Sequence, residues 1–200
     1  MGDTKLSDTM GTLLRYEPKL AGVFRNVIFG YAGAVHMYNL FERYIAGDVI
    51  VLRDSPDKYT SDNLMKKIAD AMHVLLEARS RQFFELRVMV GRQFPKNGKS
   101  DLHLVDSKGR IEPINSWKAI GKGESDANPI IERKWKENMS MKEFGEMGYC
   151  VIKYIEKEKP DGSVGGEPII RYQKNGADLD TIPSSEEIKE FQESFKTFSV

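Results

Sequence analysis

The sequence is poor in the residues that form disulfides and metal clusters. Its 200 residues include a single cysteine, Cys150, which excludes an internal disulfide and a cysteine-rich metal site. Three histidines are scattered without the spacing of metal ligands, so we expect no metal ion. Cys150 lies in an apolar stretch of an expected helix and is predicted to be a buried core residue. A chain without disulfides suits a reducing compartment, and we expect a cytoplasmic protein.

The chain also lacks an excess of charge and lacks long apolar runs. Basic residues and acidic residues both number 30, and the two signs are interleaved. Nucleic-acid-binding proteins usually carry a clustered basic excess, so we expect no nucleic-acid partner. No apolar run approaches the roughly 20 residues that cross a membrane, and no signal-peptide core is present, so we expect no membrane partner. With 40% hydrophobic residues, the chain is instead expected to form an α/β domain with a sizeable core.

Hydrophobic periodicity predicts sets of strands that alternate with pairs of helices. The expected helices cover residues 35–46, 60–79, 126–136 and 140–158, with a short amphipathic helix in the tail from residue 184. The expected strands cover residues 13–16, 27–29, 84–90, 102–105, 110–114, 117–120, 169–173 and 179–182. The polar stretch 93–100 is predicted to be a loop. Paired helices between sets of antiparallel strands indicate stacked sheets whose outer faces are covered by helices.

Two local signals are sharper than the rest. Ser140 followed by Glu143 is the pattern of a helix capping box. One face of the helix that begins near residue 60 is predicted from residues at helical spacing, which are Leu64, Ile68, Met72, Leu75 and Arg79. Both signals depend on residues three or four apart in the sequence, and they predict two helices.

Four short motifs follow one another along the chain. They are Asp3 with Lys19 sixteen residues later, Gly-Tyr-Ala-Gly at 30–33, Ala-Ile-Gly-Lys-Gly at 119–123 and Asp-Gly-Ser-Val-Gly-Gly at 161–166. In this order and spacing, they resemble the β-type subunits of the proteasome and the bacterial HslV peptidase. The resemblance runs from Gly2 to about Ile182. It predicts a proteasome-β-like domain over residues 1–183 and a helical tail over residues 184–200.

The resemblance implies an N-terminal nucleophile hydrolase fold, a four-layer α-β-β-α sandwich, and threonine-type hydrolysis of peptide bonds. In that family the nucleophile is an N-terminal threonine about fourteen residues before the aspartate, and its own α-amine serves as the base. Here only Met1 and Gly2 precede Asp3. We therefore expect the first strand and the nucleophile to be missing from this chain.

The resemblance also assigns catalytic roles by position. Lys19 corresponds to the charged lysine beside the nucleophile, and Asp3 to the aspartate that pairs with it. The backbone N–H of Gly33 corresponds to the donor of the oxyanion hole, and Asp161 to the aspartate of the last loop. No cofactor is implied.

Substrate contacts follow from the same resemblance, and so do two departures from it. Tyr31 occupies the position at the base of the specificity pocket, while Leu6 and Ser7 lie on the strand expected to pair with an extended substrate. Lys122 stands where the family has the serine of its glycine turn, and Val164 stands where it has the serine before the last Gly-Gly, although a shift of one residue would place the hydroxyl of Ser163 there.

Three functions therefore stay open. The first is a threonine peptidase whose true N-terminus lies upstream. The second is a non-catalytic structural subunit of the same ring, and the third is a related amidohydrolase with a different upstream nucleophile. The first two imply a homo- or hetero-oligomeric ring. For the peptidase, polypeptide substrates and an ATP-driven unfoldase or cap are implied as well.

Overall fold

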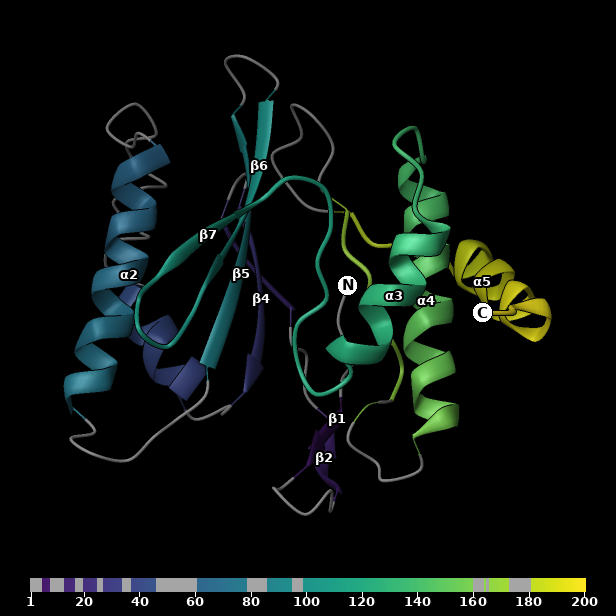
Figure 1. Cartoon of the computed structure of the whole chain (residues 1–200), viewed down its shortest axis with the longest axis horizontal. Helices are drawn as coiled ribbons and strands as arrows, with labels where there is room; N and C mark the ends of the chain where they lie inside the picture. The colour runs from purple at the N-terminus through teal and green to yellow at the C-terminus, as the bar shows by residue number, and fades with distance from the viewer. Residues whose placement is uncertain are drawn as a thin grey trace. The chain divides into compact units, whose positions relative to one another are not determined.

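A computed structural model describes residues 5–7, 13–16, 20–24, 27–33, 37–45, 61–78, 86–94, 99–159, 164, 166–172 and 181–200 (Figure 1). The chain divides into two compact units. The sheet unit consists of residues 21–117 and 175–179, and the helical unit consists of residues 1–20, 118–174 and 180–200. Among the described helices, none is long and apolar enough to cross a membrane.

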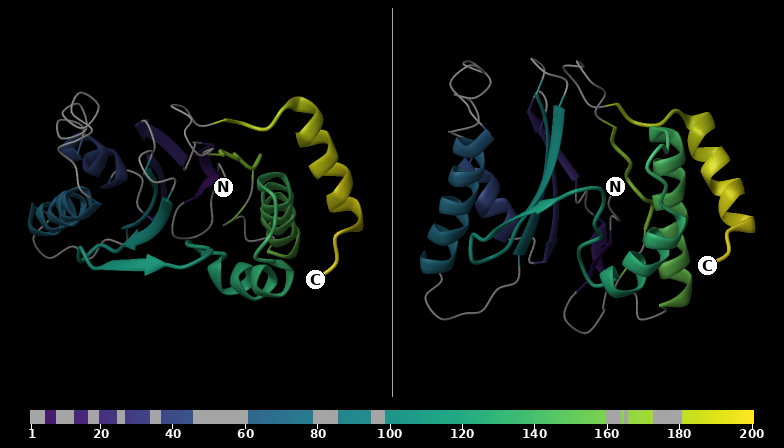
Figure 2. Two further views of the ribbon diagram at one scale, coloured as in Figure 1. Left: turned by 90° about the horizontal axis from the view of Figure 1, so that it is seen from above. Right: turned by 45° about the horizontal axis from the view of Figure 1, so that its top comes forward.

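A five-stranded sheet dominates the sheet unit. Its strands are hydrogen-bonded in chain order and comprise β3 (Leu20–Phe24), β4 (Val27–Gly33), β5 (Leu86–Phe94), β6 (Lys99–Val105) and β7 (Ile111–Ile114). The pairs from β4 to β7 are antiparallel. Helix α2 (Ser61–Ala78) and the helix over residues 37–45 pack on one face of this sheet (Figure 2).

The core of the sheet unit follows from alternation along the strands. Val88 and Val90 of β5 are fully buried and lie opposite Tyr31 and Phe29 of β4 in the antiparallel register. Side chains two residues apart in a strand share a face, so these four residues form one apolar surface. The predicted stripe of α2 is confirmed, because Leu64, Ile68, Met72 and Leu75 are all buried in the same cluster.

The strands predicted over 102–105 and 110–114 are confirmed as β6 and β7, and an aspartate stabilises the turn between them. The Asp106 carboxylate accepts the backbone N–H of Lys108 at 2.9 Å and that of Arg110 at 3.0 Å. The Arg110 guanidinium donates to the same carboxylate at 2.6 Å. A side chain that satisfies the backbone of its own turn fixes the turn without help from the core.

Three helices make up most of the helical unit. They are α3 (Glu124–Lys134), α4 (Met141–Glu158) and α5 (Ser185–Thr197). The predicted capping box of α4 is present, since Ser140 and Glu143 exchange side-chain and backbone hydrogen bonds. Ser184 and Glu187 form a second box at the start of α5. The short strands β1 (Lys5–Ser7) and β2 (Leu13–Tyr16) pair antiparallel.

Two apolar clusters hold these helices together. One joins α3 to α4 through Ile130 and Val151, and the other joins α4 to α5 through Tyr149 and Phe191. Cys150 is buried as predicted, and burial, with the nearby Glu146 charge, raises the pKa of its thiol to about 11. The thiol therefore stays protonated at neutral pH, as a core side chain does.

Some predicted elements differ from the observed ones. The mixed α/β class is confirmed, while the four-layer sandwich and the boundary at residue 183 stay predictions. The predicted strand 117–120 is wrong, because these residues form no ladder and the Ala119 N–H donates to the Asn128 side chain at 3.0 Å instead. The loop predicted over 93–100 is too long, since β5 continues to Phe94 and β6 begins at Lys99. For the strands predicted over 169–173 and 179–182, the described residues show one antiparallel bridge, between Tyr172 and Thr181.

Candidate functional site

Three of the predicted catalytic residues, Asp3, Lys19 and Asp161, lie outside the described residues. Leu6 and Ser7 lie in β1, where the structure describes the backbone and its pairing with β2. The roles assigned to all five residues stay predictions.

Gly33 is the last residue of β4 and is exposed. Its φ of 116° lies where a residue with a Cβ atom is strained, so the backbone here favours glycine. An exposed peptide without a side chain can be approached closely by another polypeptide. This geometry is compatible with the oxyanion role predicted for its N–H, and it does not test that role.

Tyr31 lies two residues earlier on the same strand, with only 6% of its surface exposed. Its ring stacks on that of Tyr38, with centroids 3.8 Å apart and planes 10° apart. Burial, the Glu42 charge and Tyr31 raise the pKa of Tyr38, so the Tyr38 ring packs as a neutral group. A side chain fixed this firmly is a rigid element of the sheet unit, and its predicted place below a specificity pocket stays untested.

The turn at residues 121–123 is built by the start of α3 in the helical unit. The Gly121 N–H donates to the Glu124 side chain at 3.1 Å, and the Glu124 N–H returns to the Gly121 carbonyl at 3.1 Å. The Gly123 carbonyl accepts the N–H of Ala127 at 2.9 Å. Lys122 is exposed at the centre of this turn. The third motif is therefore a rigid turn that presents a lysine where the family has a serine.

Val164 of the fourth motif packs directly on that turn. It is 6% exposed and belongs to the apolar cluster of α3 and α4. A Cβ atom added to Gly123 would lie 3.0 Å from Val164 Cγ2 and 3.3 Å from Ile155 Cγ2, which is too close for comfortable packing. The structure thus brings together two motifs separated by about 40 residues in the sequence. The valine that replaces the second supporting serine is a core residue here.

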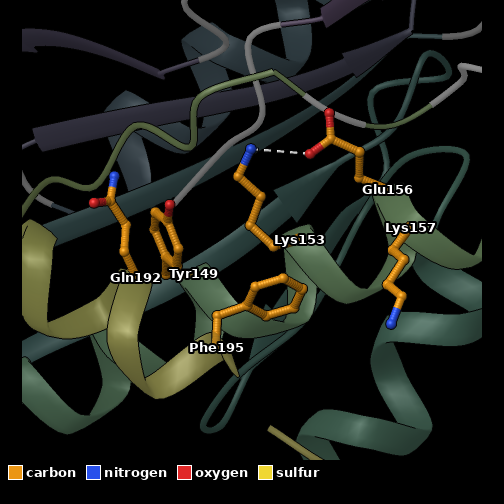
Figure 3. Close-up of a pocket in the computed structure, with 6 residues that line it drawn as sticks. All are labelled: Tyr149, Lys153, Glu156, Lys157, Gln192 and Phe195. Atoms are coloured by element: carbon orange, nitrogen blue, oxygen red, sulfur yellow. Dashed lines mark hydrogen bonds and ion pairs between the residues drawn. The ribbon is translucent and has the colours of Figure 1, made fainter. Parts of the chain in front are cut away.

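An open groove of about 340 Å³ lies between α4 and α5 (Figure 3). Its lining consists of Tyr149, Lys153, Glu156, Lys157, Gln192 and Phe195. Lys153 Nζ donates to Glu156 Oε2 at 2.9 Å and to the Gly166 carbonyl at 3.1 Å. Burial lowers the pKa of Lys153, but the Glu156 hydrogen bond and the Glu156 and Glu167 charges outweigh it and raise that pKa. The ammonium therefore stays charged in the groove.

Sequence reasoning missed a second polar cluster, which lies in the sheet unit. Arg92 is 4% exposed and donates from Nε to Asp101 Oδ1 at 2.8 Å, while its Nη2 reaches Oδ2 of the same carboxylate. His103 Nδ1 lies 3.6 Å from Asp101 Oδ1. Arg92 lies on the same face of β5 as the buried Val88 and Val90. A charged residue on an apolar face needs a partner, so the sequence pattern could have pointed to this cluster. The described residues contain no group of three metal-ligating side chains.

Comparison with known proteins adds one match. The family model described as "Proteasome subunit" matches residues 1–165. No curated protein matches the chain. The matched region contains all four motifs except the last residue of the fourth.

Proposed function

This chain belongs to the proteasome subunit family, and on that premise we propose that it is a β-type, HslV-like subunit of a self-compartmentalising peptidase. The proposed reaction is threonine-type hydrolysis of peptide bonds in polypeptide substrates. Beyond the family match, the proposal is supported by the packing of Gly123 on Val164, which unites two of the four motifs. Binding and catalytic residues are concentrated on loops that a rigid scaffold positions.

The proposed mechanism needs a threonine N-terminal to Asp3 in the working protein. Its hydroxyl attacks the carbonyl carbon, and its proton passes through the α-amine to the leaving amine. Water then hydrolyses the ester and regenerates the threonine. Lys19 would supply positive charge beside the hydroxyl, with Asp3 holding that lysine in place. The Gly33 N–H would stabilise the oxyanion, and Asp161 would support the last loop.

Substrate and assembly follow from the same proposal. The strand that contains Leu6 and Ser7 would pair with an extended polypeptide, and Tyr31 would limit the depth of the specificity pocket. The family implies an oligomeric ring. An ATP-driven unfoldase or cap and a cytoplasmic location are further parts of this proposal.

The first test is the intact mass and N-terminal sequence of the protein from its natural source. The proposal expects a mature chain that begins with threonine upstream of Asp3. In that protein, Lys19→Ala should lower the hydrolysis of short peptide amides by about 10² or more, with assembly unchanged. Lys196→Ala on α5 is the control and should keep full activity, because Lys196 is 66% exposed and pairs with the exposed Glu193. More than a tenth of the activity remaining in Lys19→Ala would remove Lys19 from the mechanism.

A second candidate, a non-catalytic ring subunit, is favoured by one observation. Lys122 and Val164 have no hydroxyl group at the positions of the family's supporting serines, and Val164 is buried in the core. A mature protein that begins at Met1 or Gly2, forms rings by native mass spectrometry and hydrolyses no peptide would establish this alternative.

A further inference from the structure

The backbone of Gly166 is held by two side chains of α4. The Gly166 N–H donates to Glu156 Oε1 at 2.9 Å, and its carbonyl accepts from Lys153 Nζ at 3.1 Å. The two side chains also bind each other at 2.9 Å, as the dashed line in Figure 3 marks. Gly166 also has a φ of 84°, a backbone conformation that favours glycine. Both polar groups of one residue are thus bound by one ion pair.

This ion pair differs from an ordinary pair on a helix surface. Lys153 and Glu156 are 22% and 33% exposed, and their hydrogen bonds reach a segment outside the helix. Glu193 and Lys196 of α5 have the same spacing of three residues, but they are 69% and 66% exposed and bind each other. A hydrogen bond is electrostatically stronger in the lower dielectric of a partly buried site than on an open surface. The pair in α5 is therefore a matched control for the pair in α4.

The segment held at Gly166 is the one that reaches the 121–123 turn. Val164 lies two residues before Gly166 and is buried against Gly123 and Ile155. Ile155 is the neighbour of Glu156 on α4, so one turn of the helix contacts both motifs. Val164 and Gly166 are two residues apart in the chain, so we expect a shift of Gly166 to change the packing of Val164 on the turn.

We propose that Lys153 and Glu156 are positioning residues, which hold the end of the fourth motif against the 121–123 turn. The inference rests on the proposed peptidase function, because it gives this pair a role in peptide hydrolysis. Neither side chain contacts the substrate. They act by fixing the backbone at Gly166 and, through it, the packing of Val164 on Gly123.

The test compares Lys153→Met and Glu156→Met with Lys196→Met in the assembled protein expressed in its natural host. Methionine keeps the length and helix propensity of the side chain and removes its charge. We expect the Gly166 N–H to exchange about tenfold faster in Glu156→Met. Hydrogen exchange measured in overlapping peptides would report this rate. In both variants, kcat for short peptides with a C-terminal aminocoumarin amide should fall about tenfold, with KM nearly unchanged. Lys153→Arg keeps a charged donor and should restore much of kcat.

Several outcomes would overturn the role proposed for Lys153 and Glu156. Unchanged exchange at Gly166 in Glu156→Met would overturn the inference, and so would faster exchange with unchanged kcat. An equal loss of kcat in Lys196→Met would show a general effect of surface charge and would overturn it too. An inactive wild-type protein would overturn the proposed function, and this inference with it, before any variant is compared. An active wild type with normal variants would overturn this inference alone.

Discussion

The sheet unit and the helical unit bury their side chains in different ways. In the sheet unit, one apolar cluster runs through α2, the helix over residues 37–45 and strands β4 to β6. In the helical unit, two smaller clusters lie on either side of α4. One of them includes Val164, which belongs to a loop and packs on the glycine of another loop.

The two units therefore depend on different kinds of contact for their structure. Regular strands and helices fill the sheet core, so its stability should depend on the volume of individual apolar side chains. Loop positions in the helical unit depend on a close glycine contact and on the polar contacts of Lys153 and Glu156. Changes there should disturb loop geometry at a smaller cost in stability.

Phe29→Ala should give the largest loss of stability. The ring is fully buried and contacts Phe41 edge-on, with centroids 6.2 Å apart. Removing it deletes a large apolar volume and leaves a cavity, so we expect a loss of about 3–5 kcal/mol in chemical denaturation. Val74→Ala on α2 is the control, because that side chain is 41% exposed. A loss below about 1 kcal/mol at Phe29 would contradict a tightly packed sheet core.

Arg92→Met should come second, because it leaves a carboxylate without its partner. Asp101 is 28% exposed and Arg92 4% exposed, so water screens the remaining charge in part. We expect a loss of about 2–3 kcal/mol in the free energy of unfolding. The double variant Arg92→Met/Asp101→Leu should recover most of that loss, since no charge is left unpaired. A double variant as unstable as the single one would show that Arg92 acts by its packing.

Gly123→Ala tests the loop contact of the helical unit. The new methyl group would meet Val164 Cγ2 at 3.0 Å, and we expect a loss of about 1–3 kcal/mol. Val164→Ala should relieve the overlap, so the double variant should lose less than the sum of the single losses. Gly91→Ala in the sheet unit is the matched control, because its nearest neighbour would lie at 3.8 Å. Additive losses for Gly123 and Val164 would mean that the two motifs do not depend on this contact.

The smallest effect should be the pH dependence given by Asp106. Burial alone would raise the pKa of this carboxyl, but the hydrogen bonds from Arg110 and Lys108 lower it below its usual range. A pKa lower in the folded chain means that the carboxylate stabilises the fold above about pH 4 and loses that effect as pH falls through the lowered value. Asp106→Asn should cost about 1 kcal/mol at pH 7 and less at a pH below the lowered pKa of Asp106. An equal cost at both pH values would exclude the charge as the cause.

Much of the secondary structure could be predicted from the sequence. The capping box of Ser140 and Glu143 and the stripe of α2 depend on residues three or four apart, so the sequence itself contains the signal. The strand predicted over 117–120 was wrong, because an apolar run does not reveal that Asn128 will accept the Ala119 N–H. For the predicted site, the sequence showed the order of the four motifs. The roles of Asp3, Lys19 and Asp161 stay predictions, because these residues lie outside the described part of the chain.

The sequence by itself determined the family and the local elements, because both are written in short patterns of neighbouring residues. Only the tertiary structure decided which distant groups meet. The pairing of Arg92 with Asp101 follows from strand register, and the contact of Gly123 with Val164 follows from how two loops lie on α4. The hold of Lys153 and Glu156 on Gly166 is of the same kind. A lysine three residues before a glutamate is common on helix surfaces. No local pattern tells which backbone carbonyl or N–H group the two side chains will bind.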